Sequence, residues 1–136
     1  MHQPDRSFTC ERPLFVASIP AGFPSPADDY VEGTLDLNQH LIKHPAATFF
    51  VRVTGDSMID AGIHPGDLLI VDRALTPAEG DVVIAVLDGE LTVKRLQRVN
   101  AKPVLVADNR RYPPIRPREN QEFEMWGVVT YVIHKV

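Results

Sequence analysis

The chain has 136 residues, of which 44% are hydrophobic and 24% charged, and its formal net charge is −4 at pH 7. This length suits one domain with a substantial core, and the 14 scattered lysines and arginines argue against a nucleic-acid-binding surface as the main function. The single cysteine, Cys10, excludes an intrachain disulfide, and because no apolar stretch is long enough for a membrane span and the N-terminus has no signal pattern, we expect a cytoplasmic protein.

The first 30 residues are rich in proline. Proline fixes φ and removes a backbone donor, so few helices or central strands tolerate this density. We predict an extended, weakly ordered arm over residues 1–30, followed by one domain over residues 31–136. The prolines that carry this prediction are Pro4, Pro13, Pro20, Pro24 and Pro26.

A short helix is predicted within residues 35–44, where apolar side chains recur at helical spacing. Asp36 can cap its start, and Pro45 disfavours helix at its end. His40 and His44 would then stand four residues apart, a spacing that can hold a metal. Without a cysteine or glutamate cluster nearby we interpret them as a surface pair, and we expect neither a metal nor another cofactor.

The rest of the chain predicts strands, because short runs of Val, Ile, Phe and Tyr are separated by Gly, Pro and Asp. Asp88-Gly89 is a two-residue hairpin signal, since both positions accept positive φ. The run at 81–87 is apolar on both faces and should lie centrally. These features predict a compact, mainly antiparallel β domain with one short helix. The expected strands are Thr48–Thr54, Leu68–Asp72, Asp81–Leu87, Leu91–Val99, Val104–Ala107 and Phe123–His134.

Ser57, in the stretch Thr54–Asp60 (TGDSMID), is either a turn residue or a nucleophile, because a serine is inert until a base takes its proton. Alternation along residues 91–96 puts Thr92 and Lys94 on one face of a strand. If that face turns inward, burial can deprotonate Lys94, and Thr92 is placed to hydrogen-bond the amine. A base at neutral pH needs burial to supply about 4 kcal/mol. If the face turns outward, Lys94 is an ordinary solvated lysine.

Other partners for Ser57 are weaker candidates. His2 lies in the arm, and His134 is near the other end of the chain. Asp56 and Asp60 flank the serine, yet aspartates beside glycine in loops usually cap turns. A serine–lysine dyad is therefore the one nucleophilic arrangement that the residues support.

The motifs around this dyad resemble those of the self-cleaving serine peptidases of the LexA and phage-repressor family. The likeness runs from about residue 14 to the C-terminus, and two further stretches favour the SOS mutagenesis branch of the family. It implies a LexA-like peptidase β domain preceded by a cleavable arm, with Ser57 as nucleophile and Lys94 as general base. The matching stretches are Gly55–Met58, Pro65–Asp67, Thr92–Leu96, Ala21–Val31, and Asp36–Gln39 through Pro45.

The resemblance also implies that the substrate is the protein's own arm, cut at an Ala–Gly or Cys–Gly bond. Ala61-Gly62 lies just past the serine motif, in a segment that the fold should fix. Ala21-Gly22 lies in the proline-rich arm, in the register that the family uses, and is the predicted cleavage site. The backbone N–H groups of Ser57 and Asp56 are expected to stabilise the oxyanion, with Thr92 supporting the lysine.

The partners implied by the resemblance are a RecA–single-stranded-DNA filament, which favours docking of the arm, and a second copy of the chain. The processed homodimer would serve as a subunit of an error-prone Y-family translesion DNA polymerase, beside a UmuC-type catalytic subunit. A LexA-like repressor fragment is less consistent, because the 21 residues before Gly22 have no helical periodicity and no net charge. A non-catalytic β-rich interaction module, in which Ser57 is only a turn residue, remains the alternative.

Overall fold

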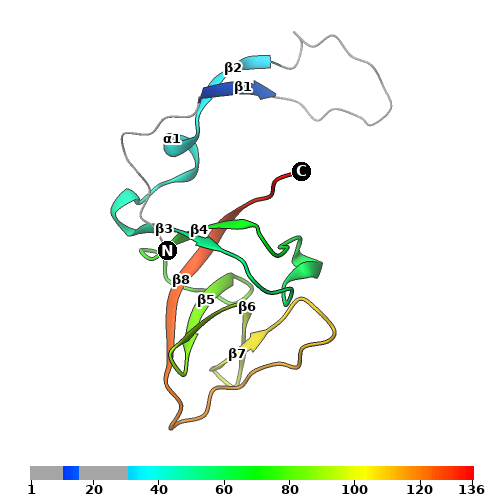
Figure 1. The fold of residues 1–136 in the computed structure, drawn as a ribbon. Coiled ribbons are helices and arrows are strands. Elements are labelled where there is room, and N and C mark those ends of the chain that lie inside the picture. Colours follow the sequence, from blue (N-terminus) through cyan, green and yellow to red (C-terminus); the bar gives the residue numbers. More distant parts are fainter. Residues whose placement is uncertain (1–10, 16–30) are drawn as a thin grey trace. The chain divides into compact units, whose positions relative to one another are not determined.

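The computed structural model describes residues 11–15 and 31–136 (Figure 1). They divide into two compact units, one with the described residues up to Pro45 and one from Ala46 to Val136, and each is described by itself. No helix in the described part has the length and apolar character that a bilayer span requires. The predicted boundary between an arm and a domain after residue 30 stays a prediction.

The smaller unit contains a two-stranded antiparallel sheet that we did not predict. Strand β1 (Glu11–Phe15) pairs with strand β2 (Val31–Asp36), and Pro13 lies opposite Thr34. A strand with one neighbour needs only half of its backbone groups for the ladder. Proline is therefore tolerated in β1, whose extended backbone agrees with the extended conformation expected from the prolines, although a paired strand was not expected there.

The predicted helix is confirmed together with its cap, but it is shorter than expected. Helix α1 spans Leu37–Leu41, and the Asp36 carboxylate accepts a hydrogen bond from the N–H of Asn38 at 3.0 Å. Ile42 is already extended and its side chain is buried, so the helix ends before His44. The two histidines at 40 and 44 therefore do not share one helix, and the spacing that could have held a metal is lost.

The larger unit is a six-stranded antiparallel sheet, as predicted. Its strand order is β3-β4-β8-β5-β6-β7, so that β8 runs between β4 and β5 (Figure 1). Each predicted strand is present within two residues of its expected ends. Short 3₁₀ turns cover Pro45–Ala47 and Ile59–Ala61. The strands are β3 (Thr48–Arg52), β4 (Leu68–Asp72), β5 (Val82–Leu87), β6 (Glu90–Val99), β7 (Lys102–Val106) and β8 (Phe123–Ile133).

The hairpin between β5 and β6 has the predicted turn. Asp88 and Gly89 take φ values of 50° and 82°, and the strands pair up to Leu87 and Glu90. Strand β5 lies between β6 and β8, and its middle residues are fully buried. The central position predicted from its apolar pattern is confirmed.

Strand β8 pairs with β4 and β5, and at Gly127 its backbone comes very close to Val71 of β4. A Cβ built on Gly127 would lie 2.6 Å from Cγ1 of Val71, which is itself fully buried. The register of β8 also shifts beside this point, between Ile84 and Ala85 of β5. Only glycine fits here, because any side chain would displace the core of the sheet.

We therefore expect Gly127→Ala to lower the free energy of unfolding by about 1–3 kcal/mol, the usual cost of overpacking a core. Gly55→Ala is the matched control, because Gly55 has no neighbour within 4 Å of the added Cβ and no positive φ. Urea unfolding of both variants measures the difference. Equal midpoints would show that β8 can move away from Val71 without cost.

Candidate active site

Ser57 lies on the loop between β3 and β4, and this loop is closed at its base. Val53 and Asp67 are joined by a backbone hydrogen bond of 2.9 Å, and Gly66 donates to the Val53 carbonyl at 2.8 Å. Next to the serine, Met58 is only 2% exposed and belongs to the hydrophobic core. The loop is therefore anchored on both sides of Ser57, which limits where its hydroxyl can go.

Lys94 lies on the buried face of β6. Of the two orientations that the sequence left open, the structure therefore has the one in which this face turns inward. Its cross-strand partner Val83 is fully buried, as is Leu96 two residues along the strand, and Lys94 itself is 7% exposed. Strand β7 pairs with β6 only from Arg95 onward. The part of β6 before Arg95 therefore turns an edge that β7 does not cover toward the serine loop.

The Lys94 ammonium meets three acceptors. Its Nζ donates to Oγ of Ser57 at 3.0 Å, to Oγ1 of Thr92 at 2.9 Å and to the carbonyl oxygen of Val93 at 3.2 Å. The Ser57 hydroxyl in turn donates to the same Val93 carbonyl at 3.4 Å. Burial lowers the pKa of Lys94 below its ordinary value near 10.5. The structure thus brings together the predicted nucleophile, base and supporting hydroxyl.

Serine and lysine both line a cavity of about 540 Å³. Its walls are largely apolar, which suits the desolvation of a buried lysine. Arg52, Asp56 and Tyr112 are the charged and phenolic groups at its boundary besides Lys94. Within residues 11–15 and 31–136 the structure gives no hydrogen-bond acceptor to the backbone N–H of Asp56 or Ser57. The apolar lining includes Val51, Val53, Ile63, Ile84, Leu91 and Val93.

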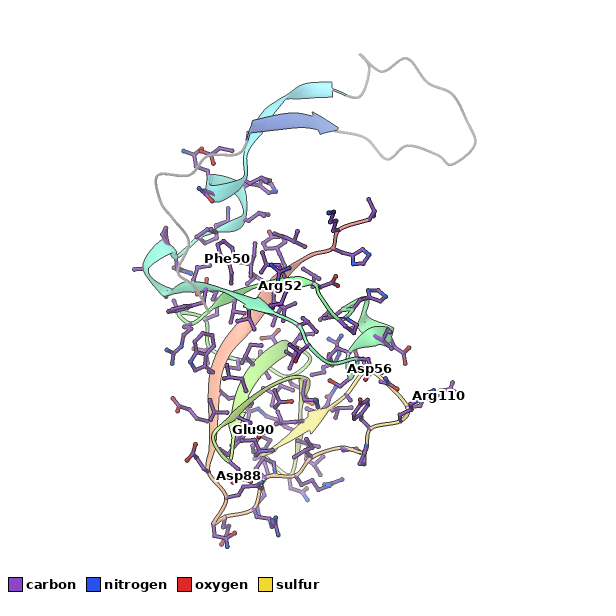
Figure 2. The ribbon with its side chains drawn as sticks, viewed as in Figure 1. Phe50, Arg52, Asp56, Asp88, Glu90 and Arg110 are labelled. Atoms are coloured by element: carbon purple, nitrogen blue, oxygen red, sulfur yellow. The ribbon has the colours of Figure 1, made fainter. Side chains whose placement is uncertain are left out.

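A second segment, residues 108–112, supports the serine loop. Asn109 donates through Nδ2 to the carbonyl of Asp56 at 2.9 Å, and Tyr112 donates its hydroxyl to the Asp56 carboxylate at 2.5 Å. Figure 2 shows Asp56 next to the segment that carries Arg110. Asp108 accepts from Arg95, with Nη2 at 2.7 Å from Oδ2, so the segment is also tied to the strand of Lys94. One loop therefore contacts the chain neighbours of both dyad residues, Asp56 next to Ser57 and Arg95 next to Lys94.

A comparison with protein families shows which family the chain belongs to. The model of the Peptidase S24-like family matches residues 13–130 of the chain. The chain belongs to the peptidase S24-like family. Membership confirms the expected resemblance to a serine peptidase family and agrees with the mainly β fold.

Curated relatives of this S24 chain cover most of its length. SamA of Salmonella typhimurium is 54% identical over 123 residues, which are 90% of this chain and 85% of that protein. ImpA of Escherichia coli is 52% identical over 126 residues, covering 91% and 84%. MucA of Escherichia coli is 46% identical over 121 residues, covering 88% and 82%. These relatives are UmuD-like proteins, so the expected likeness to the SOS mutagenesis branch of the S24 family is confirmed.

The remaining predicted site residues of the S24 chain stand apart from the dyad or outside the described residues. Ala21 and Gly22 belong to the residues that the structure does not describe. Asp60 is exposed, and its N–H donates to the Asp108 carbonyl at 2.8 Å. His134 lies against Asp67 rather than Ser57. No sequence signal indicated Asn109 or Tyr112, because their contacts with Asp56 span more than 50 residues and follow no local period.

The hydrogen bond to Asp56 raises the pKa of Tyr112 above its ordinary value of 10.0, because the carboxylate accepts from the neutral phenol and repels the phenolate. We expect Asp56→Ala to lower the pKa of Tyr112 toward 10.0. Ultraviolet titration of tyrosine, with Tyr112→Phe to identify the signal, measures it. An unchanged titration curve in Asp56→Ala would show that the bond does not persist in solution.

Proposed function

We propose that the chain is a self-cleaving serine endopeptidase of the SOS mutagenesis type, which cuts its own arm between Ala21 and Gly22. The observation that carries the proposal is the 3.0 Å contact between Nζ of a buried lysine, Lys94, and Oγ of Ser57. A surface lysine on a strand would be solvated and fully charged at neutral pH. A lysine that has lost most of its hydration and contacts a serine is suited to act as its base.

The reaction begins when Lys94 is neutral. Its lone pair takes the proton of Ser57, and Oγ bonds to the carbonyl carbon of Ala21. The negative charge moves to the Ala21 oxygen, where the N–H groups of Ser57 and Asp56 stabilise it. The Lys94 ammonium then gives its proton to the nitrogen of Gly22 as the C–N bond breaks. Water hydrolyses the acyl-enzyme and restores Ser57.

The hydrogen bonds of the structure fit the resting state before this reaction. Nζ of Lys94 donates to Oγ of Ser57, while the serine hydroxyl is directed to the Val93 carbonyl. Loss of one proton from the ammonium frees a lone pair, and rotation of the hydroxyl from Val93 to Nζ then makes the serine the donor. Thr92 continues to accept from the amine and holds it in place.

Control of the reaction lies with the arm in this proposal. A tethered bond reacts as an intramolecular partner, an advantage of up to about 10⁵–10⁸ M in effective concentration. The arm over residues 1–30 must therefore rest outside the site for most of the time. A RecA–single-stranded-DNA filament would favour the docked population. The processed chain, residues 22–136, would then act as a homodimer and as a subunit of a Y-family polymerase with a UmuC-type catalytic partner.

Incubation of the purified chain at alkaline pH tests the proposal. We expect two fragments by mass spectrometry, one ending at Ala21 and one beginning at Gly22, and no fragments from Ser57→Ala. Addition of RecA, single-stranded DNA and nucleotide should accelerate the same cut at neutral pH.

The non-catalytic interaction module predicts that the wild-type chain stays intact under both conditions, which would overturn the proposal. A cut at Ala61–Gly62 that depends on Ser57 would retain the dyad and reject the cleavage site. Release of the first fragment from an inactive chain by an active one would assign the reaction to neighbouring copies rather than to one chain.

A further inference from the structure

A second cluster of polar side chains lies at the base of the serine loop, apart from Ser57 and Lys94. His64, Asp67 and His134 each offer one metal-ligand atom, and these atoms lie within 4.8 Å of one another. Nδ1 of His134 lies 2.6 Å from Oδ1 of Asp67, and Nδ1 of His64 lies 3.7 Å from Oδ2. The two imidazole rings are 5.1 Å apart between their centroids. Two imidazoles thus converge on one carboxylate.

The sheet brings the three residues together. Asp67 precedes β4 and His134 follows β8, and the antiparallel register pairs Leu68 with Ile133. Asp67 and His134 each lie one residue beyond this last pair, and their side chains meet there. His64 reaches the same point through the turn His64–Asp67, which closes with a backbone bond of 3.0 Å. The paired ends of β4 and β8 and the turn His64–Asp67 therefore place the backbones of the three residues close together.

Some polar atoms of this cluster have hydrogen-bond partners, and one buried nitrogen has none. The Asp67 side chain is 3% exposed, and its Oδ2 accepts from the backbone N–H of His64 at 2.8 Å. Nδ1 of His64 is buried and has no hydrogen-bond partner among the described residues. A buried nitrogen without a partner is costly, and native proteins usually satisfy it with water or an ion. Nδ1 of His64 therefore faces Oδ2 of Asp67 at 3.7 Å without a hydrogen bond to it.

We propose that His64, Asp67 and His134 bind a divalent transition-metal ion, Zn²⁺, at the junction of the serine loop and the end of β8. Two imidazole nitrogens and one carboxylate oxygen are a common zinc ligand set, and the fourth position faces solvent. Zinc at about 2.0–2.1 Å from each ligand needs neighbouring ligand atoms about 3.3 Å apart. The His64 and His134 side chains are 44% and 49% exposed, so they can adjust to this spacing around the fixed Asp67.

The bound ion would act on the fold rather than on the peptide bond. The backbone bond between Asp67 and Val53 closes the serine loop, and His134 belongs to the segment after β8. Zinc would therefore cross-link the end of the last strand to the base of that loop. Binding would replace the 2.6 Å contact between Nδ1 of His134 and Oδ1 of Asp67, because a metal-bound imidazole nitrogen carries no proton. The ion would stabilise the folded chain in proportion to its concentration relative to Kd.

Zinc binding to the intact chain tests the site. We expect isothermal titration calorimetry to show one Zn²⁺ per chain, with an increase in Tm on saturation and no response to Mg²⁺. His134→Asn and His64→Asn should each lower the affinity at least about tenfold, and the double variant should abolish the rise in Tm. His40→Asn, which changes an exposed histidine on α1, should bind as the wild type does.

Asp67→Asn tests the carboxylate, but it can also impair folding because this side chain is buried. The histidine variants are therefore the decisive test of the zinc site. Both side chains are half exposed, so their replacement should leave the fold intact, and circular dichroism checks this. No uptake of zinc at any concentration at which the ion stays in solution would overturn the site. Uptake by the double histidine variant with the wild-type affinity would overturn it equally, because the ion would then bind elsewhere.

Discussion

Replacement of Lys94 with arginine is expected to stop self-cleavage at every pH between 6 and 10.5. Arginine keeps the positive charge and the length of the side chain, but it cannot lose its proton in a protein. The hydroxyl of Ser57 would then have a donor beside it and no base. General-base catalysis contributes about 10²–10⁴-fold, so the rate should fall by at least about 10²-fold. The fraction of intact chain is followed by gel densitometry after incubation with the RecA filament.

Lys102→Arg is the matched control, because Lys102 begins β7, is exposed and lies outside the cavity that holds the dyad. It should cleave at the wild-type rate. Melting curves of both variants check that a loss of cleavage does not reflect a loss of fold. An active Lys94→Arg chain would exclude lysine as the base, while an inactive Ser57→Ala chain alongside it would keep the nucleophile.

The pH profile of self-cleavage should rise steeply from neutral pH and level off below 10.5. Only the neutral form of Lys94 can act, and burial lowers its pKa from 10.5. Below that lowered pKa the neutral fraction, and with it the rate, increases about tenfold for each unit of pH. Rates of fragment formation in a buffer series measure the slope and the plateau. A rate that falls with rising pH would contradict a lysine base.

The same lowered pKa has a consequence for stability. Because the unfolded lysine holds its proton up to about 10.5, the unfolded state binds more protons than the folded state between the lowered pKa and 10.5. The contribution of Lys94 to the free energy of unfolding therefore rises with pH through this window. Below the lowered pKa both states are protonated, and the full cost of burying the charge is present. Lys94→Met should remove this dependence, as urea unfolding at several pH values can show.

Much of the larger unit was predictable because its signals are local. The apolar runs between turn residues placed the strands, and Asp88-Gly89 placed the hairpin through backbone freedom alone. The period of two along β6 also put Thr92 and Lys94 on one face. It could not say that this face was buried, because burial depends on Val83 of the neighbouring strand.

The features that could not be predicted depend on contacts between distant residues. Asn109 and Tyr112 contact Asp56 across more than 50 positions, and His134 meets Asp67 across 67. Helix α1 ends at Leu41 because Ile42 has an extended backbone, which helical spacing in the sequence does not reveal. Local pattern therefore predicted the strands of the larger unit and put Thr92 and Lys94 on one face, while Asn109 and Tyr112, which hold the serine loop, came only from the tertiary fold.

Under the proposed function, the three acceptors around Nζ of Lys94 help to set how long the uncleaved chain survives. Each proton of the ammonium has an acceptor in Ser57, Thr92 or Val93, and these hydrogen bonds offset part of the burial that lowers the pKa of Lys94. A chain that cleaves itself reacts only once, so the property that its site controls is the time for which the uncleaved precursor survives. Each unit of pKa changes that survival about tenfold. Under the proposed function, these hydrogen bonds help to set the rate at which the precursor is cleaved. Replacement of Thr92 would change that rate, because it removes one acceptor of the ammonium.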